Sequence, residues 1–141
     1  GGHRDLHSFP TRRSSDLPAQ IFPLRCTAHM SYEDMRALLD QSPALPTLLI
    51  AGNDLLAIGA LKALKERKIN VPQDVSIIGF DDMPISRMMD PPLTSIRIYN
   101  DEIAKAAIKR LIEKIQAEDK CSMKIEVYGD LMIRESVKRL K

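Results

Sequence analysis

The stretch Val-Pro-Gln-Asp-Val-Ser-Ile-Ile-Gly-Phe-Asp-Asp, residues 71–82, decides the fold class of this chain. Its middle, residues 75–78, is an apolar run interrupted only by Ser76, which is typical of a strand buried on both faces of a parallel sheet. The run ends at a glycine, an aromatic residue and two acids. In open α/β sheets ligands bind outside the carboxyl ends of the strands, so we expect Asp81 and Asp82 where a ligand would be met.

A second apolar run, residues 47–51, also ends in polar residues, Asn53 and Asp54. Between the two runs, residues 55–67 carry apolar side chains at helical spacing, which predicts an amphipathic helix. Strand, helix and strand have the length of a βαβ unit, in which the two strands are parallel. Both polar endings are therefore expected at the same edge of one sheet.

Shorter signals predict the elements around this unit. Ser31 is interpreted as the N-cap of a helix of about ten residues that ends near Gln41. Residues 83–90 have room for only a turn or two of helix, and the doubled proline after them predicts an extended segment at residues 93–98.

The last part of the chain is predicted to hold one long helix and an extended end. Asn100 or Asp101 is interpreted as the cap of a helix running to about Ala117, with an apolar stripe rich in alanine. Residues 125–134, which centre on Gly-Asp, predict a final extended pair or one bent strand.

Composition and charge describe one ordinary globular domain. The 141 residues carry a formal net charge of +2 with bases and acids interleaved, so nothing predicts a nucleic-acid surface on this piece. Cys26 and Cys121 lie far apart, which favours reduced thiols and a cytoplasmic location. No apolar run reaches membrane-spanning length. Residues 1–17 lack the apolar core of an export signal, and we expect an unstructured tail of the kind left by a cloning or adapter junction.

Two blocks carry a family resemblance: residues 71–82 and the run Pro-Pro-Leu-Thr-Ser-Ile at residues 91–96. They resemble the C-terminal part of LacI/GalR-family transcriptional repressors, and the likeness runs from about Met30 to Arg139. The resemblance implies a periplasmic-binding-protein-like α/β fold, with an open parallel sheet, helices on both faces and a crossover helix. It also implies that residues 18–141 form a partial effector-binding and dimerisation domain, without the helix-turn-helix headpiece and the N-terminal subdomain.

Asn53 and Asp81 are the candidate effector-binding residues. A sugar hydroxyl both donates and accepts hydrogen bonds, and amide and carboxylate side chains in a partly dry cleft hold it well. Taken singly, each has a structural interpretation, Asn53 or Asp54 as a helix N-cap and Asp81 as a turn residue. As a pair that matches the positions at which the resembled family contacts its effector, they favour ligand binding. Phe80 is added as a ring for a sugar face, with a place in the core as its alternative.

The resemblance assigns a dimer interface to this chain, and the chain departs from the family's usual residues at two places. The family builds its homodimer interface on one face of the helix after residue 54 and on the segment before the doubled proline. These positions carry Ile58, Leu61, Met88 and Met89. Burial in the core is the alternative for them.

The family commonly has glutamine in the crossover where this chain has Arg97-Ile98, which implies a different sugar pattern. It usually has glycine at the end of the helix, where Lys68 or the nearby Asn70 must supply a left-handed conformation.

The implied function is the sugar-effector-binding part of a cytoplasmic, homodimeric, DNA-binding repressor. Its partners are a small-molecule sugar or sugar-phosphate effector, and operator DNA bound only through the headpiece, with no membrane. The implied mechanism is a population shift, in which the effector prefers one arrangement of two subdomains. The alternative is a sugar-binding protein of a transport system, which shares the fold. The run at residues 91–96 and the Arg134-Glu135-Ser136 ending resemble repressors instead.

An enzyme is not expected. Asp54, Asp81 and Asp82 at one sheet edge suggest a Mg²⁺ site, because hard cations bind carboxylate oxygens. However, the sequence has no Gly-rich phosphate loop and no nucleophile elbow, and the nearest histidine to these acids is the distant His29. We therefore predict neither a cofactor nor a metal site.

Overall fold

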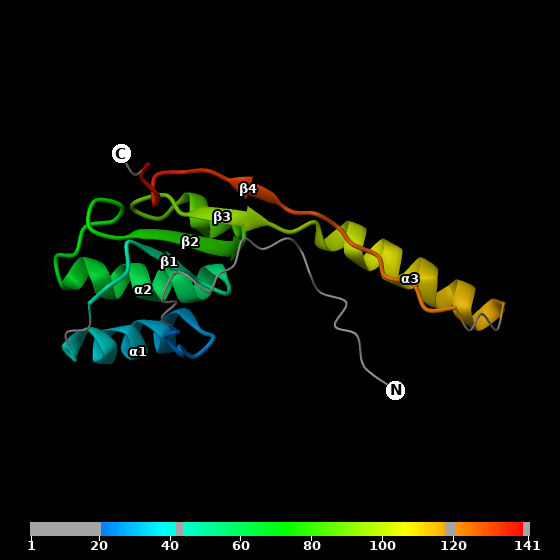
Figure 1. Cartoon of the computed structure of the whole chain (residues 1–141), viewed down its shortest axis with the longest axis horizontal. Coiled ribbons are helices and arrows are strands. Elements are labelled where there is room, and N and C mark those ends of the chain that lie inside the picture. The colour runs from blue at the N-terminus through cyan, green and yellow to red at the C-terminus, as the bar shows by residue number, and fades with distance from the viewer. Residues whose placement is uncertain (1–20, 42–43, 118–120, 140–141) are drawn as a thin grey trace, which may run out of the picture.

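The computed structural model describes residues 21–41, 44–117 and 121–139 and divides into a lobe and an arm (Figure 1). The lobe holds a four-stranded sheet with strand order β1-β2-β3-β4, and the arm consists of α3 together with residues 121–129. The elements are α1 (Ala28–Asp40), β1 (Leu48–Ile50), α2 (Asp54–Glu66), β2 (Ser76–Asp81), the short 3-10 helix η2 (Pro84–Arg87), β3 (Thr94–Arg97), α3 (Asn100–Gln116) and β4 (Asp130–Met132).

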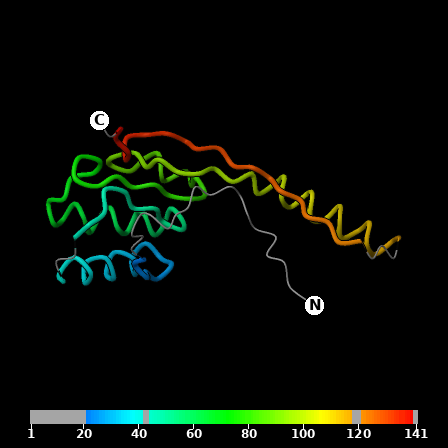
Figure 2. Tube along the Cα trace, viewed as in Figure 1, coloured from blue at the N-terminus to red at the C-terminus, as the bar shows by residue number. Residues whose placement is uncertain are grey.

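The sheet is open and mostly parallel, which confirms the predicted α/β class. β1, β2 and β3 run parallel, with Ile50 opposite Ile78 and Asp81 opposite Arg97. The βαβ unit formed by β1, α2 and β2 is the one predicted, and it brings the carboxyl ends of β1 and β2 to one edge. β4 adds an antiparallel strand beside β3. An extended pair or one bent strand was predicted at residues 125–134, and the structure has this single short strand there. Residues 121–129 run along α3, where Arg110 donates to Cys121 O at 2.8 Å (Figure 2).

The first helix begins earlier than the sequence predicted. Its N-cap is Thr27, whose hydroxyl accepts a hydrogen bond from the Met30 N–H at 3.1 Å. Ser31 is therefore not the cap but a buried residue of the second turn, where its hydroxyl donates to Leu56 O at 2.8 Å. The end near Gln41 is as predicted.

Close packing of two helices forms the layer beneath the sheet. α2 lies against the sheet and α1 lies against α2, on the same side (Figure 1). Gly59 makes this approach possible, because a Cβ there would lie 2.5 Å from Ala28 O and 2.6 Å from Tyr32 N. The buried apolar residues are Met35, Leu39, Ala57, Ala60, Leu61, Ala63, Leu64, Val75, Ile77 and Leu93.

The end of α2 confirms the expected left-handed residue. Lys68 has φ 58°, and its N–H donates to Lys65 O at 3.0 Å. The next N–H, from Ile69, donates to Leu64 O at 3.0 Å, so the last carbonyls of the helix are satisfied in a Schellman arrangement. A lysine thus performs the turn that glycine would make with less strain.

The arm has no core of its own. None of the α3 residues is buried, and its apolar stripe is open, with Ile115 70% exposed. Asn100 and Asp101 lie in the first turn of α3, and the N-cap position belongs to Tyr99, which makes no side-chain cap bond. The predicted cap was therefore wrong by one or two residues, although the helix itself was predicted. Within the described residues no helix is long and apolar enough to cross a membrane.

Candidate functional site

The carboxyl ends of β1 and β2 bring two polar pairs together, Asn53-Asp54 and Asp81-Asp82. Asn53 is the N-cap of α2, and its side-chain oxygen accepts from the Leu56 N–H at 2.9 Å. Asp81 and Asp82 both have positive φ, 104° and 50°. L-residues rarely adopt this conformation, and its occurrence at a strand end turns the chain so that Asp81 is exposed and Asp82 is buried.

Asp54 is fully buried and ties three segments together. Its carboxylate accepts hydrogen bonds from the Met83 N–H at 2.7 Å, from the Ser95 hydroxyl at 2.6 Å and from the Ser86 hydroxyl. As the first residue of α2 it also lies at the positive end of the helix dipole, which favours a carboxylate. The alternative assignment of Asp54 as the cap is thus excluded, because Asn53 caps and Asp54 anchors the neighbouring loops.

Gly79 makes room for this buried carboxylate. A Cβ at this position would collide with Asp54 Oδ1 and would lie 2.9 Å from Leu93 Cδ2. The close approach of Asp54 to β2 therefore explains Gly79, because only a residue without a side chain leaves space for this carboxylate.

Asp82 lies among three arginines. Arg97 donates to it through Nε at 2.8 Å, Arg134 forms a second ion pair, and Arg87 approaches at 3.4 Å. Burial alone would raise the pKa of Asp82, but the hydrogen bonds from Arg134 and Arg97 outweigh it, so the pKa lies below its usual value. The Ser95 hydroxyl, which donates to Asp54, also accepts from the Asp82 N–H at 3.1 Å.

We call the set Asp54, Ser95, Asp82, Arg97 and Arg134 the buried network. Its two carboxylates are used by protein donors, so Asp82 is not the ligand-facing residue that the sequence suggested. The left-handed turn explains the difference, because it points two successive carboxyl groups in different directions. Among the described residues no group of three histidine, cysteine or acidic side chains is arranged to hold a metal ion.

We call the set Asn53, Phe80 and Asp81 the exposed rim. Within the described part of the chain, the Asp81 carboxylate has no hydrogen-bond or ion-pair partner. Burial and then repulsion from Asp54 raise the pKa of Asp81 above its usual value. Phe80 is 37% exposed at the strand end. The rim therefore offers an amide, a carboxylate and a ring edge that the fold leaves available.

The four residues assigned to a dimer surface fall into different surroundings. Leu61 is 4% exposed and belongs to the core, as its alternative interpretation had it. Met88 is 84% exposed, whereas Ile58 and Met89 are half-buried. In the crossover, Ile98 is half-buried and Arg97 has entered the buried network. The dimer assignment itself stays a prediction.

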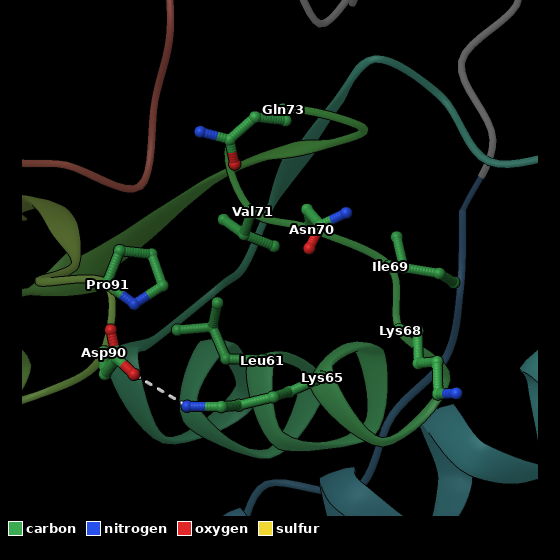
Figure 3. Close-up of a pocket in the computed structure, with 9 residues that line it drawn as sticks. All are labelled: Leu61, Lys65, Lys68, Ile69, Asn70, Val71, Gln73, Asp90 and Pro91. Atoms are coloured by element: carbon green, nitrogen blue, oxygen red, sulfur yellow. Dashed lines mark hydrogen bonds and ion pairs between the residues drawn. The ribbon is translucent and has the colours of Figure 1, made fainter.

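Two hollows in the lobe were compared with the position of the rim. One of about 200 Å³ opens at the other end of α2, where Lys65 forms an ion pair with Asp90 at 2.7 Å (Figure 3). Another of about 500 Å³ lies under β1 and is lined mainly by apolar side chains, among them Met35 and Leu49. Neither contains Asn53 or Asp81. The candidate site is therefore defined by the polar side chains at the sheet edge and not by a hollow in the lobe.

Sequence reasoning missed Ser95, Arg97 and Arg134 as parts of the site. Arg134 is 52 residues from Asp82, and no local pattern links them. A signal for Arg97 did exist, because an extended segment was predicted at residues 93–98, and such a segment can pair with β2 as a further parallel strand. As a neighbour of β2, it would have placed Arg97 beside the two acids.

Comparison with known proteins assigns the class. The family model for a periplasmic binding protein-like domain matches residues 11–137, and the chain therefore belongs to this family. That match begins within residues 1–17, which lie outside the described residues, so the predicted tail stays a prediction.

Its relatives are repressors, which confirms the resemblance to the LacI/GalR type. The HTH-type transcriptional repressor PurR of Haemophilus influenzae is 42% identical over 112 residues, covering 77% of this chain and 33% of that protein. The chain spans about a third of the length of the curated relatives it matches. Two solved structures are LacI family transcriptional regulators. That of Enterococcus faecium with bound ribose has 29% identity and TM-score 0.70, covering 85% of this chain and 44% of its own. That of Arthrobacter sp. FB24 in complex with lactose has 28% identity and TM-score 0.68, covering 82% and 43%.

Proposed function

We propose that this chain is the sugar-effector-binding part of a LacI-type transcriptional repressor. The exposed rim carries the proposal, because Asn53 and Asp81 follow adjacent parallel strands and the Asp81 carboxylate has no partner among the residues that the structure describes. Hydroxyl groups need such acceptors and donors. The sugar-bound relatives support the same ligand class.

The sugar is held between this rim and a second subdomain of the whole protein. The Asn53 side-chain oxygen is occupied by its cap bond, so its NH₂ group is the part that donates to a sugar oxygen. Asp81 accepts from one or two hydroxyls, and the Phe80 ring meets an apolar sugar face. The effector shifts the population of subdomain arrangements, and operator DNA is bound through a separate headpiece.

The wider assignments belong to the same proposal. The protein acts in the cytoplasm as a homodimer, and Ile58, Met88 and Met89 contribute to the dimer surface. We do not expect it to be an enzyme, and the occupation of Asp54 and Asp82 by protein donors supports this expectation. A repressor is favoured over a transport protein because the relatives compared are repressors.

An Asp81→Ala variant of the intact repressor tests this function. We expect the variant to bind operator DNA as the parent does and to lose release by sugar, because one hydroxyl acceptor is gone. Glu135→Ala is the matched control, since this exposed carboxylate lies near the amino ends of β2 and β3. Fluorescence anisotropy of labelled operator, titrated with a panel of sugars, measures both properties. An unchanged sugar response in Asp81→Ala would remove the assigned role.

A further inference from the structure

A strained turn at the end of β2 sets the position of Asp81 on the exposed rim. Asp81 and Asp82 have φ 104° and 50°, and neither is glycine. Residues with a side chain keep such angles only where the surrounding contacts fix them, and they gather at sites that bind ligands. The contacts that fix this turn therefore decide where the Asp81 carboxylate points.

Two peptide groups flank the Cα of Asp81, and together they set the direction of its side chain. The group before it belongs to the sheet, because Asp81 is the last residue of β2 and lies in register with Arg97 of β3. The group after it lies beyond the strand and carries the Asp82 N–H, which donates to the Ser95 hydroxyl at 3.1 Å. The Ser95 side chain thus holds the peptide group on the far side of Asp81.

The Ser95 hydroxyl is itself held in place. It is fully buried and donates to Asp54 Oδ1 at 2.6 Å, while it accepts from the Asp82 N–H. An N–H can only donate, so the two bonds use the donor and the acceptor side of one hydroxyl. Asp54 also accepts from the Met83 N–H at 2.7 Å, which fixes the next peptide group of the turn. One serine on β3 therefore links the start of α2 to the turn that carries Asp81.

Loss of this hydroxyl would remove the acceptor of the Asp82 N–H. A buried N–H without an acceptor is unfavourable, so the turn is expected to shift until this group finds a new partner. The Asp82 carboxylate would still be bound by Arg97 and Arg134, so the sheet edge keeps other anchors. We expect the turn to move and the lobe to stay folded.

We propose that Ser95 is a positioning residue of the sugar site. Its hydroxyl acts through the Asp82 N–H and fixes the Asp81 carboxylate in the direction that a sugar hydroxyl requires. Because Ser95 is fully buried, it does not touch the sugar. This inference rests on the proposed function, because it explains how the same site is preorganised for its ligand. The alternative is a serine that serves stability alone.

Ser136 provides a matched control for that alternative. It is also fully buried, and its hydroxyl accepts from the Thr94 N–H at 2.8 Å and donates to Ile77 O at 2.6 Å. Each serine thus makes one accepted and one donated hydrogen bond. Ser136 acts near the amino ends of β2 and β3, whereas the bond from the Asp82 N–H to Ser95 lies at the carboxyl end of β2.

Isothermal titration calorimetry on the intact gene product separates the two roles. Ribose, lactose and glucose are titrated into the parent, Ser95→Ala and Ser136→Ala, at a temperature at which each protein is folded. For the sugar that the parent binds best, we expect Ser95→Ala to bind about tenfold more weakly, because a charged hydrogen-bond acceptor is misplaced. Ser136→Ala should lose thermal stability but keep the parent affinity, because its bonds do not reach the turn.

Two further variants make the test independent of a single substitution. Ser95→Thr keeps the hydroxyl and should recover most of the sugar affinity. If Ser95→Ala does not fold, Ser95→Cys takes its place with the same expected direction, because a thiol is only a weak donor and acceptor.

Three results would overturn the inference and leave the proposed function standing, provided that Asp81→Ala still loses sugar binding. They are parent affinity in Ser95→Ala, an equal loss in Ser136→Ala, and a folded Ser95→Thr protein that binds as weakly as Ser95→Ala. If Asp81→Ala binds sugar as the parent does, or if the parent binds no sugar of the panel, the proposed function fails and the inference fails with it.

Discussion

The buried network and the exposed rim are built from neighbouring residues with opposite surroundings. Asn53 and Asp54 are adjacent, as are Asp81 and Asp82, yet Asp54 and Asp82 are buried, whereas Asp81 is exposed and Asn53 is half-buried. Asp54 and Asp82 accept hydrogen bonds from protein donors, whereas the Asp81 carboxylate accepts none within the described residues. The difference teaches that the enclosed acids hold the sheet edge in shape, and it supports the proposal that Asp81 and the Asn53 amide bind a ligand.

Removal of Asp82 should have the largest effect on folding. Asp82→Ala removes the buried carboxylate that Arg97 and Arg134 share, and breaking a buried ion pair costs at most about 3–5 kcal/mol, less where a partner is partly exposed as Arg97 is. Asp81→Ala, one residue earlier, should change the free energy of unfolding by less than about 0.5 kcal/mol. Urea denaturation of both variants measures the contrast. Equal losses in the two variants would mean that the rim is as structural as the network.

A methyl group at Gly79 should disturb the buried network at Asp54. Gly79→Ala places a Cβ against Asp54 Oδ1 and 2.9 Å from Leu93 Cδ2, and overpacking of this kind costs about 1–3 kcal/mol. Gly52→Ala is the control, because its Cβ would meet only Leu56 Cδ1 at 3.8 Å. Thermal unfolding compares the two. A Gly79→Ala protein as stable as the parent would show that Asp54 does not press against β2.

The two aspartates at the end of β2 should respond to pH in opposite directions. The pKa of Asp82 is lowered in the folded protein, so its stabilisation is complete above the unfolded pKa of about 3.9 and is lost as the pH falls through the folded value. The pKa of Asp81 is raised, so its ionised form disfavours folding at neutral pH and this penalty disappears in acid.

Asn substitutions at the two positions make this difference measurable. Asp82→Asn should be less stable than the parent at neutral pH, with the gap closing in acid. Asp81→Asn should be slightly more stable at neutral pH, and its advantage should also vanish in acid. Unfolding free energies between pH 7 and pH 3 provide the comparison, and parallel curves for the two variants would contradict the assigned surroundings.

A small gain in stability is expected from relief of backbone strain at the rim. Asp81 has φ 104°, which glycine adopts without a Cβ penalty, so Asp81→Gly should raise the free energy of unfolding by about 0.5–1 kcal/mol. The same variant should lose the response to sugar. Thermal unfolding together with the operator-release assay checks both, and a destabilised Asp81→Gly protein would show that the carboxylate has a structural partner.

The sequence allowed much of the lobe to be predicted, and local chemistry explains why. Apolar runs and a helical period define β1, α2 and β2, and the topology of a βαβ unit then places Asn53 and Asp81 at one edge. The partition between Asp81 and Asp82 was not predictable, because it depends on positive φ at two residues other than glycine. The pairing of Asp82 with Arg134 could not be predicted, because it depends on the path of the last segment of the chain, which no residue near Asp82 encodes.

Boundaries and caps were less certain for a related reason. Thr27 and Ser31 are both good cap residues, and the choice between them follows from packing of α1 on α2, where Ser31 is enclosed and bonds to Leu56 O. The arm shows the same limit. The spacing of apolar residues predicted α3 correctly. It does not tell whether another element covers the apolar stripe of the helix, and in the described chain the stripe is exposed.

A crystal structure of the intact protein with its sugar tests the central claim most directly. We expect a sugar hydroxyl within about 2.5–3.2 Å of an Asp81 carboxylate oxygen, with the Asn53 amide on the same ligand and Asp82 still enclosed by its arginines. A sugar bound at another surface, with Asp81 facing only solvent, would contradict the account.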